Sequence, residues 1–179
     1  LADQRSNKYG YIHIDQHHDM WGDSEGWSFR RLNCGGFVKS IRGNTNASQV
    51  LTIGAQKVED KIKGNPDFYH HISNYELKKS GVLCVAHALE KLPEDVYISI
   101  DLDFLEQEEI TTGWLRGSFK KEMLLHCLAF IQEKKRVIGV DVCGWDANDQ
   151  FGNTKIRYTP DAIKALAIHY DLAGLILNP

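Results

Sequence analysis

The sequence predicts an α/β protein with a three-layer α/β/α architecture around a mainly parallel sheet, in one domain spanning residues 1–179. Short, continuous apolar runs recur along the chain, as expected for strands that a parallel sheet buries on both faces. Stretches with helical spacing lie between them, which is the alternation typical of this fold class. A composition of 42% hydrophobic and 25% charged residues suits one globular domain of 179 residues.

Five apolar runs are the expected strands, and two stretches are the expected helices. The strands are residues 9–14, 50–53, 82–85, 96–100 and 137–140. The clearest helix covers residues 119–134, where apolar side chains from Met123 to Ile131 recur at helical spacing. A second helix is expected to begin at Thr159, which suits the N-cap, followed by Pro160 in the first turn.

Acidic residues follow two of the expected strands. Asp15, His17 and Asp19 alternate after the first strand, and Asp101 and Asp103 follow the fourth. Every second side chain of a strand points to the same side, so each motif can converge on one centre. A single Asp would be explained equally well as a helix cap or loop residue. Two such motifs at the carboxyl ends of strands, where α/β sheets bind ligands, indicate a metal site.

The charge of these side chains predicts two divalent cations. Four aspartates packed together would repel one another, whereas two M²⁺ ions and a neutral imidazole bring the sum to zero. Ligands rich in oxygen favour Mn²⁺, with Zn²⁺ as the alternative. Two ions about 3.5–4 Å apart lower the pKa of the water between them, so the expected reaction class is hydrolysis.

At these residues the chain resembles the arginase family, the ureohydrolases. Asp15-Gln-His17-His-Asp19 is similar to the family motif Asp-Ala-His-x-Asp. Ser99-Ile-Asp101-Leu-Asp103-Phe-Leu-Glu resembles Ser-x-Asp-x-Asp-x-x-Asp, and residues 137–141 resemble the later strand that carries acidic substrate-site residues. The resemblance implies an arginase-like or deacetylase-like fold with two Mn²⁺ per chain.

The chain departs from the family pattern in three places. The family's first metal ligand is a His on an earlier strand, and no histidine precedes Tyr9. Either that N-terminal strand lies outside the given chain or another residue substitutes; His13, about 6–7 Å from Asp15 along a strand, is expected to support or pack against the ligands. Gly144 stands where family arginases have a Glu, which leaves Asp146 as a candidate guanidinium contact. Glu106-Gln replaces the Asp-Pro that follows the family's second motif.

These departures and the short length resemble the divergent peptide arginases, which convert arginine side chains in ribosomal peptides to ornithine and urea. The implied enzyme is a metal-dependent hydrolase of amidine C–N bonds. The roles that the resemblance implies are bridging by Asp15 and Asp101, binding of one ion by His17 and Asp103, binding of the other ion and proton transfer by Asp19, guanidinium orientation by Asp141 or Asp146, and substrate binding by Asn33. The segment 21–29, with aromatic and small residues, is the expected pocket rim.

Other functions remain open at this stage. The substrate alternatives to an arginine-containing peptide are free arginine and agmatine, which are small guanidino compounds. A single-metal deacetylase of the same fold would leave Asp19 and Asp103 without a role, and a non-catalytic binding protein would hold no metal. Cys34, near the first motif, could serve a Cys/His hydrolase, but no oxyanion-hole signature accompanies it.

Charge and hydropathy exclude several classes of partner. The formal net charge of −3 argues against a broad nucleic-acid or anionic-membrane surface. No run approaches the roughly 20 apolar residues needed to cross a bilayer. Four widely spaced cysteines suggest reduced thiols, and the expected location is cytoplasmic. A homo-oligomer is compatible with the sequence, which does not fix the oligomeric state.

Overall fold

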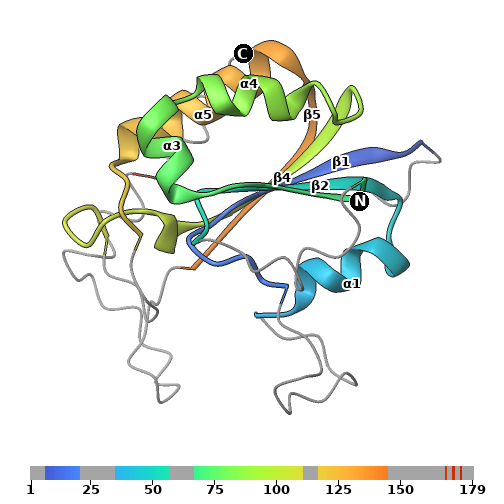
Figure 1. The fold of residues 1–179 in the computed structure, drawn as a ribbon, viewed down its shortest axis with the longest axis horizontal. Helices are drawn as coiled ribbons and strands as arrows, with labels where there is room; N and C mark the ends of the chain where they lie inside the picture. The colour runs from blue at the N-terminus through green and yellow to red at the C-terminus, as the bar shows by residue number, and fades with distance from the viewer. Residues whose placement is uncertain are drawn as a thin grey trace.

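A parallel sheet of five strands forms the centre of the protein, as the computed structural model shows (Figure 1). The structure describes residues 7–20, 35–56, 67–110 and 117–144, together with residues 168, 171 and 174. The strand order is β3-β2-β1-β4-β5, and every pairing is parallel. The strands are β1 (Tyr9–Ile14), β2 (Ala47–Ile53), β3 (Tyr69–Ile72), β4 (Asp95–Asp101) and β5 (Arg136–Cys143).

Helices cover both faces of this sheet, which confirms the predicted three-layer architecture. In Figure 1, α1 lies below the sheet, while α3, α4 and α5 lie above it. Their bounds are α1 (Phe37–Asn44), α3 (Asn74–Ser80), α4 (Leu83–Leu89) and α5 (Lys121–Lys134), and a short 3₁₀ helix, η3 (Leu102–Phe104), follows β4. No helix in the described ranges is long and apolar enough to span a membrane.

The two faces of β1 differ in chemistry. Ile12 and Ile14 enter the apolar core that packs against α3, α4 and α5. Tyr11 and His13 point to the opposite face, where Tyr11 belongs to a second core with Val38 of α1. Strand alternation therefore separates an apolar face from a mixed face, and the mixed face carries His13 towards the carboxyl edge of the sheet.

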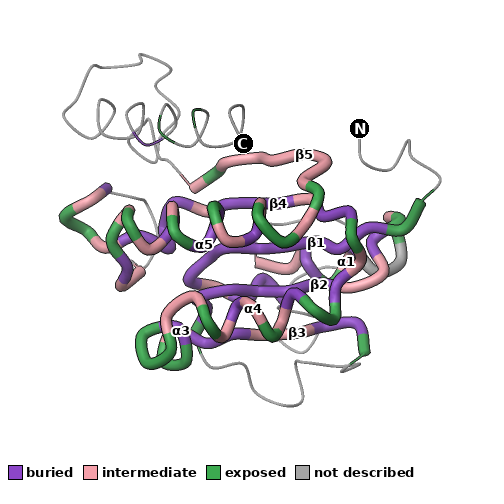
Figure 2. The backbone as a smooth tube through the Cα atoms, turned by 90° about the horizontal axis from the view of Figure 1, so that it is seen from above, coloured by how far each residue is buried: buried purple, intermediate pink, exposed green. Residues whose placement is uncertain are grey.

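The central strands are buried, and β5 is only partly covered. Figure 2 shows β1 and β4 in purple and most of β5 in pink. β1 pairs with β2 on one side and with β4 on the other. The chain adds β2 and β3 towards one edge of the sheet and then β4 and β5 towards the other, so the order of addition reverses between β1 and β4. Ligands of open α/β sheets bind at such a reversal, beyond the carboxyl ends of the strands. The fold thus brings both aspartate motifs to its expected binding edge.

The predicted strand at residues 82–85 is wrong, because this run lies in the first turns of α4. Gly81 ends α3 with a φ of 56°, and the helix that follows buries Val85 and Leu89 at i, i+4 spacing. A short apolar run does not by itself distinguish a strand from a buried helix. Strand β3, which pairs with β2, was not predicted from the sequence, because this strand is short and two of its four residues are histidines.

The other predicted elements have different outcomes. Strands β1, β2, β4 and β5 overlap the remaining predicted runs, and α5 confirms the helix expected at residues 119–134. The helix expected to begin at Thr159 lies largely outside the described residues; the described positions 168, 171 and 174 are helical.

Candidate metal centre

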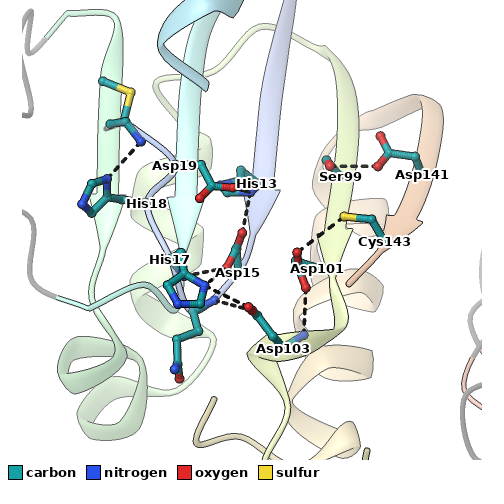
Figure 3. Close-up of polar contacts among 12 residues, drawn as sticks. His13, Asp15, His17, His18, Asp19, Ser99, Asp101, Asp103, Asp141 and Cys143 are labelled. Atoms are coloured by element: carbon teal, nitrogen blue, oxygen red, sulfur yellow. Dashed lines mark hydrogen bonds and ion pairs between the residues drawn. The ribbon is translucent and has the colours of Figure 1, made fainter. Parts of the chain in front are cut away.

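Both aspartate motifs meet where β1 and β4 end side by side (Figure 3). His13 of β1 is paired in register with Ser99 of β4, so the residues that follow them leave the sheet at the same edge. The backbone N–H of Gln16 lies 3.4 Å from Oδ1 of Asp103, which joins the two segments. Residues that are 87 positions apart in sequence therefore form one site.

The first set of ligand atoms comes from His13, Asp15 and Asp19, which we call the His13 group. Nε2 of His13 lies 2.9 Å from Oδ2 of Asp15 and 3.6 Å from Oδ2 of Asp19. All three residues are buried, and His13 is only 1% exposed. One imidazole nitrogen and two carboxylates thus converge away from solvent.

The backbone conformation of Asp19 brings its carboxylate back towards β1. Asp19 has a φ of 45°, a left-handed conformation that Asp tolerates better than most residues. The backbone N–H of Val38 donates to the carbonyl of Asp19 at 3.2 Å. The first turn of α1 therefore holds the residue that closes the His13 group.

The second set comes from Asp15, His17 and Asp103, which we call the His17 group. Nδ1 of His17 lies 2.8 Å from Oδ2 of Asp103 and 3.4 Å from Oδ1 of Asp15. The His17 side chain is 28% exposed, so this group faces the outside of the protein more than the His13 group does. Asp15 offers its two oxygens to the two groups and is common to both.

Burial and repulsion between carboxylates raise the pKa values of three aspartates at the site. Burial, followed by repulsion from Asp15, raises the pKa of Asp19 to about 8. Burial raises the pKa of Asp103 to about 7, although the hydrogen bond from His17 opposes this shift. The pKa of Asp101 is also raised, by burial and then by Asp15. A nearby cation would relieve these groups, because it favours their charged forms.

The pKa values of His13 and His17 are both raised at the positions where cations would bind. Hydrogen bonds to Asp103 and Asp15 raise the pKa of His17 to about 10. Burial lowers the pKa of His13, but its hydrogen bond and charge interaction with Asp15 outweigh burial and raise it. Burial also opposes ionisation of Asp15, yet the hydrogen bonds from His13 and His17 lower its pKa overall. The negative charge of Asp15 therefore stabilises the protonated forms of both His13 and His17.

Both groups fit a divalent cation. Within each group the ligand atoms lie within 4.8 Å of one another. Each offers hard carboxylate oxygens and a single imidazole nitrogen, a donor set that suits Mn²⁺ better than the sulfur-rich sites typical of structural zinc. No other group of this kind occurs among the residues that the structure describes. A shared carboxylate makes the pair suitable for two adjacent ions.

Asp101 lies beside these groups and belongs to neither. Its Oδ1 accepts a hydrogen bond from the backbone N–H of Asp103 at 2.9 Å, and its Oδ2 lies 3.7 Å from Sγ of Cys143. Gly144 is packed against the same carboxylate, since a Cβ there would stand 1.7 Å from Oδ1. The contacts orient Asp101 through its surroundings, and the predicted bridging role stays a prediction.

Asp141 is tied to β4 rather than to the two groups. Oγ of Ser99 donates to Oδ1 of Asp141 at 2.9 Å, as Figure 3 shows. His18, which follows His17, has turned away: its Nδ1 accepts from the backbone N–H of Met20 at 3.0 Å. Burial, followed by the nearby charges of His71 and His17, lowers the pKa of His18 to about 4. His18 is therefore a neutral neighbour of the site.

The structure brings Asp15, His17, Asp19 and Asp103 together, with Asp101 alongside. Nε2 of His13 lies among the candidate ligand atoms, and the supporting role expected of this residue stays a prediction. Spacing along the strand suggested too large a separation, but the imidazole is long and the chain bends at residues 15–17, just after β1. The predicted residues Asn33, Asp146 and Cys34 and the rim segment 21–29 lie outside the described residues.

The fold and these candidate ligand groups are those of an α/β protein with a binding site at the carboxyl edge of a parallel sheet. The arginase family matches residues 1–156, and the chain belongs to that family. The family resemblance seen in the two aspartate motifs is thus confirmed over most of the chain. No curated protein matches the sequence.

Solved structures with the same fold include several relatives of the arginases. A proclavaminate amidino hydrolase from Streptomyces clavuligerus has 20% identity and a TM-score of 0.73, over 97% of this chain and 57% of that chain. A hypothetical agmatinase from Burkholderia thailandensis has 20% identity and a TM-score of 0.70, over 94% and 50%. Trypanosoma cruzi formiminoglutamase with Mn²⁺ has 14% identity and a TM-score of 0.73, over 95% and 57%.

The similarity is one of fold, and it covers only part of these proteins. This chain spans between 50% and 57% of the length of the three structures. At 14–20% identity, the side chains that recognise substrate need not correspond. Substrate assignment therefore depends on the residues of this chain.

Proposed function

We propose that this protein is a binuclear manganese hydrolase that cleaves the guanidinium group of a peptide-bound arginine to give ornithine and urea. The observation that carries this proposal is the pair of ligand groups that share Asp15. Each group combines one imidazole with two carboxylates, so the set is suited to two ions close together. Two bound Mn²⁺ would lower the pKa of a water molecule between them and so supply a nucleophile at neutral pH.

The chain's own carboxylates supply the charge balance and the proton transfer. Asp15, shared by the two groups, is the principal bridging ligand, and Asp101 is the second bridging candidate. Asp19 is the proton acceptor in this proposal, because its carboxylate lies beside His13 and Asp15, where the first ion and its bound water would be held. The His13 and His17 rings orient these carboxylates by direct contact.

The reaction adds water to the guanidinium carbon and breaks its bond to the side-chain nitrogen. A carbon–oxygen bond forms as Asp19 removes a proton from the water. The carbon–nitrogen bond then breaks, and Asp19 returns that proton to the leaving nitrogen. Both protons of the water end on this nitrogen, so the products are urea and an ammonium group. Asp141, oriented by Ser99, or Asp146 would hold the guanidinium during this step.

The surroundings of Gly144 leave no room for a side chain at this position. Family arginases carry a Glu at this position, which resemblance links to the guanidinium contact. Here a Cβ would stand 1.7 Å from Asp101 Oδ1, and the backbone φ of +83° disfavours any L side chain. A Glu is therefore incompatible with the observed position of Asp101. The rim segment 21–29 offers aromatic and small residues suited to a peptide backbone, with Asn33 nearby in sequence.

Mass spectrometry of an internal-arginine peptide incubated with the manganese-loaded protein tests this function. Loss of the mass of CH₂N₂ from the peptide, with an equal yield of urea, is the expected result. Free arginine and agmatine are incubated in parallel, and the peptide is expected to have the highest kcat/KM. Faster turnover of either small molecule would overturn the peptide assignment, and no urea from any of the three would overturn guanidinium hydrolysis.

An acetyl-lysine peptide provides the matched control for the single-metal alternative. A deacetylase would need only an Asp, a His and one further Asp, whereas this chain has two complete ligand groups. We therefore expect no loss of the acetyl group. Deacetylation in the presence of one equivalent of metal would favour that alternative instead.

A further inference from the structure

We infer that His13 is a direct ligand of the first metal ion, through the Nε2 nitrogen that β1 places beside Asp15 and Asp19. This inference rests on the proposed binuclear function. It goes further by assigning a nitrogen ligand to a residue two positions before Asp15. The His13 group would then be completed by His13, Asp15 and Asp19 from a single stretch of chain.

The position of the imidazole supports this assignment. Nε2 of His13 lies 2.9 Å from Asp15 Oδ2 and 3.6 Å from Asp19 Oδ2. A cation that contacted these three atoms would replace the proton that His13 and Asp15 now share. Since β1 ends at Ile14 and the chain then bends, the carboxylate of Asp15 does not continue the straight line of the strand. The side chains therefore converge although their backbone positions are two residues apart.

The packing of His13 fixes which nitrogen can act as a ligand. The ring is 1% exposed and meets the ring of Phe37 edge to face, with centroids 5.3 Å apart and an interplanar angle of 90°. Its Nδ1 is buried without a hydrogen-bond partner among the described residues, so Nε2 is the nitrogen aimed at the carboxylates. A buried histidine that lacks a partner on one nitrogen gains most from a strong interaction at the other.

The composition of the two groups gives independent support. The His17 group contains one imidazole and two carboxylates, and so does the His13 group. With both histidines neutral, the four aspartates and two divalent ions still sum to zero charge. The neighbouring His18 belongs to neither group, because its Nδ1 accepts from the backbone of Met20. His13 is thus the histidine in the described part of the chain that matches His17.

Metal analysis of three histidine variants tests the inference. His13→Gln, His17→Gln and His18→Gln are saturated with Mn²⁺, desalted and analysed for manganese per chain, with circular dichroism to confirm folding. We expect two ions in wild type and in His18→Gln, and one in each of the other two variants. Electron paramagnetic resonance should show a spin-coupled pair in wild type and an isolated Mn²⁺ in His13→Gln and His17→Gln.

A measurement on His17→Gln covers the case in which His13→Gln does not fold. Its remaining Mn²⁺ should show hyperfine coupling to one directly bound histidine nitrogen, and ¹⁵N-histidine labelling should change that coupling. Absence of the coupling would overturn the assignment of His13. Two spin-coupled ions in a folded His13→Gln variant would overturn it as well.

The proposed function fails in a different way. If wild-type protein retains no manganese pair, the binuclear hydrolase itself is wrong, whatever the variants show. If wild type holds two ions and hydrolyses its guanidino substrate while His13→Gln still holds two, only the ligand assignment is wrong.

Discussion

The two ligand groups of the metal centre differ in burial although they share Asp15. His13 is 1% exposed, whereas the His17 side chain is 28% exposed. The His13 group packs against α1, where the His13 ring meets Phe37 and the carbonyl of Asp19 accepts from the first turn. The His17 group instead contacts η3, because His17 pairs with Asp103. The His17 group is therefore the more accessible of the two from outside the protein, and the His13 group is the more enclosed.

The largest expected effect comes from changing the residue common to both groups. Asp15→Asn removes the charge that both imidazoles contact, so both ions should be lost. Changes to residues that only support metal ligands lower activity by up to about 100-fold, so kcat/KM should fall by more than about 100-fold here. Elemental analysis and urea release measure these outcomes. Asp101→Asn, which alters a residue outside both groups, should reduce manganese occupancy less. Equal losses in the two variants would remove the special position of Asp15.

A glycine substitution tests how strictly Asp101 is positioned. Gly144→Ala would place a Cβ 1.7 Å from Asp101 Oδ1 at a φ of +83°, so Asp101 must move and manganese affinity should fall about 10-fold or more. Gly81→Ala is the matched control, with a φ of +56° and no atom within 4 Å. It should cost roughly 1–3 kcal/mol of unfolding free energy. Its manganese affinity should remain that of wild type; a shared loss of affinity would point to general destabilisation.

The raised pKa values predict that manganese stabilises the protein more strongly at higher pH. In the metal-free protein Asp19 and Asp103 titrate at about 8 and about 7, above their ordinary value of 3.8. Their folded forms bind protons more tightly than the unfolded chain, so their contribution to stability falls as pH rises from 3.8 through these values. The contribution of His17, with a pKa of about 10, is complete below 6.5 and is lost through 10.

Thermal unfolding with excess Mn²⁺ or EDTA measures this dependence. The difference in Tm between the two conditions should increase from about pH 6 to about pH 9, because the metal-free protein weakens over that range. In His17→Gln the increase should be smaller, since one of the displaced protons is absent. A difference in Tm that stayed constant with pH would show that metal binding displaces no protons.

The smallest effect is expected at Cys143. Its Sγ lies 3.7 Å from Asp101 Oδ2, while the backbone N–H of Asp103 already holds the other oxygen at 2.9 Å. Cys143→Ala should therefore change unfolding free energy by no more than about 0.5 kcal/mol, with unchanged manganese content. A loss of one ion in this variant would instead make the thiol a metal ligand of the more exposed side of the site.

The sequence predicted the sheet, and the convergence of Asp15, His17, Asp19 and Asp103 at its edge, for a physical reason. Apolar runs and alternating aspartates are local patterns, and β1 and β4 follow directly from them. The proximity of His13 to Asp15 and Asp19 was not predictable from spacing alone, because it depends on the bend after Ile14 and the left-handed turn at Asp19. Both are tertiary features, set in part by packing against α1.

Helix boundaries show a similar limit. The predicted strand at residues 82–85 failed since an apolar run carries no information about its period. A helix signal is present earlier in the chain, where Ser73 and Glu76 form a capping box at the start of α3, with Ser73 Oγ accepting from the Glu76 N–H. This motif marks the start of α3, which ends at Gly81, so it does not identify the separate helix α4 that follows.

The sequence separation of the ligands also sets the order in which the site can assemble. The His13 group comes from residues 13–19, whereas the His17 group needs Asp103 from the far side of a long loop. Closing that loop requires β4 to have been synthesised and paired with β1. The His13 group could therefore form once α1 has packed against residues 13–19, and the His17 group only after β4 has paired with β1, so the two groups would assemble in two kinetic stages.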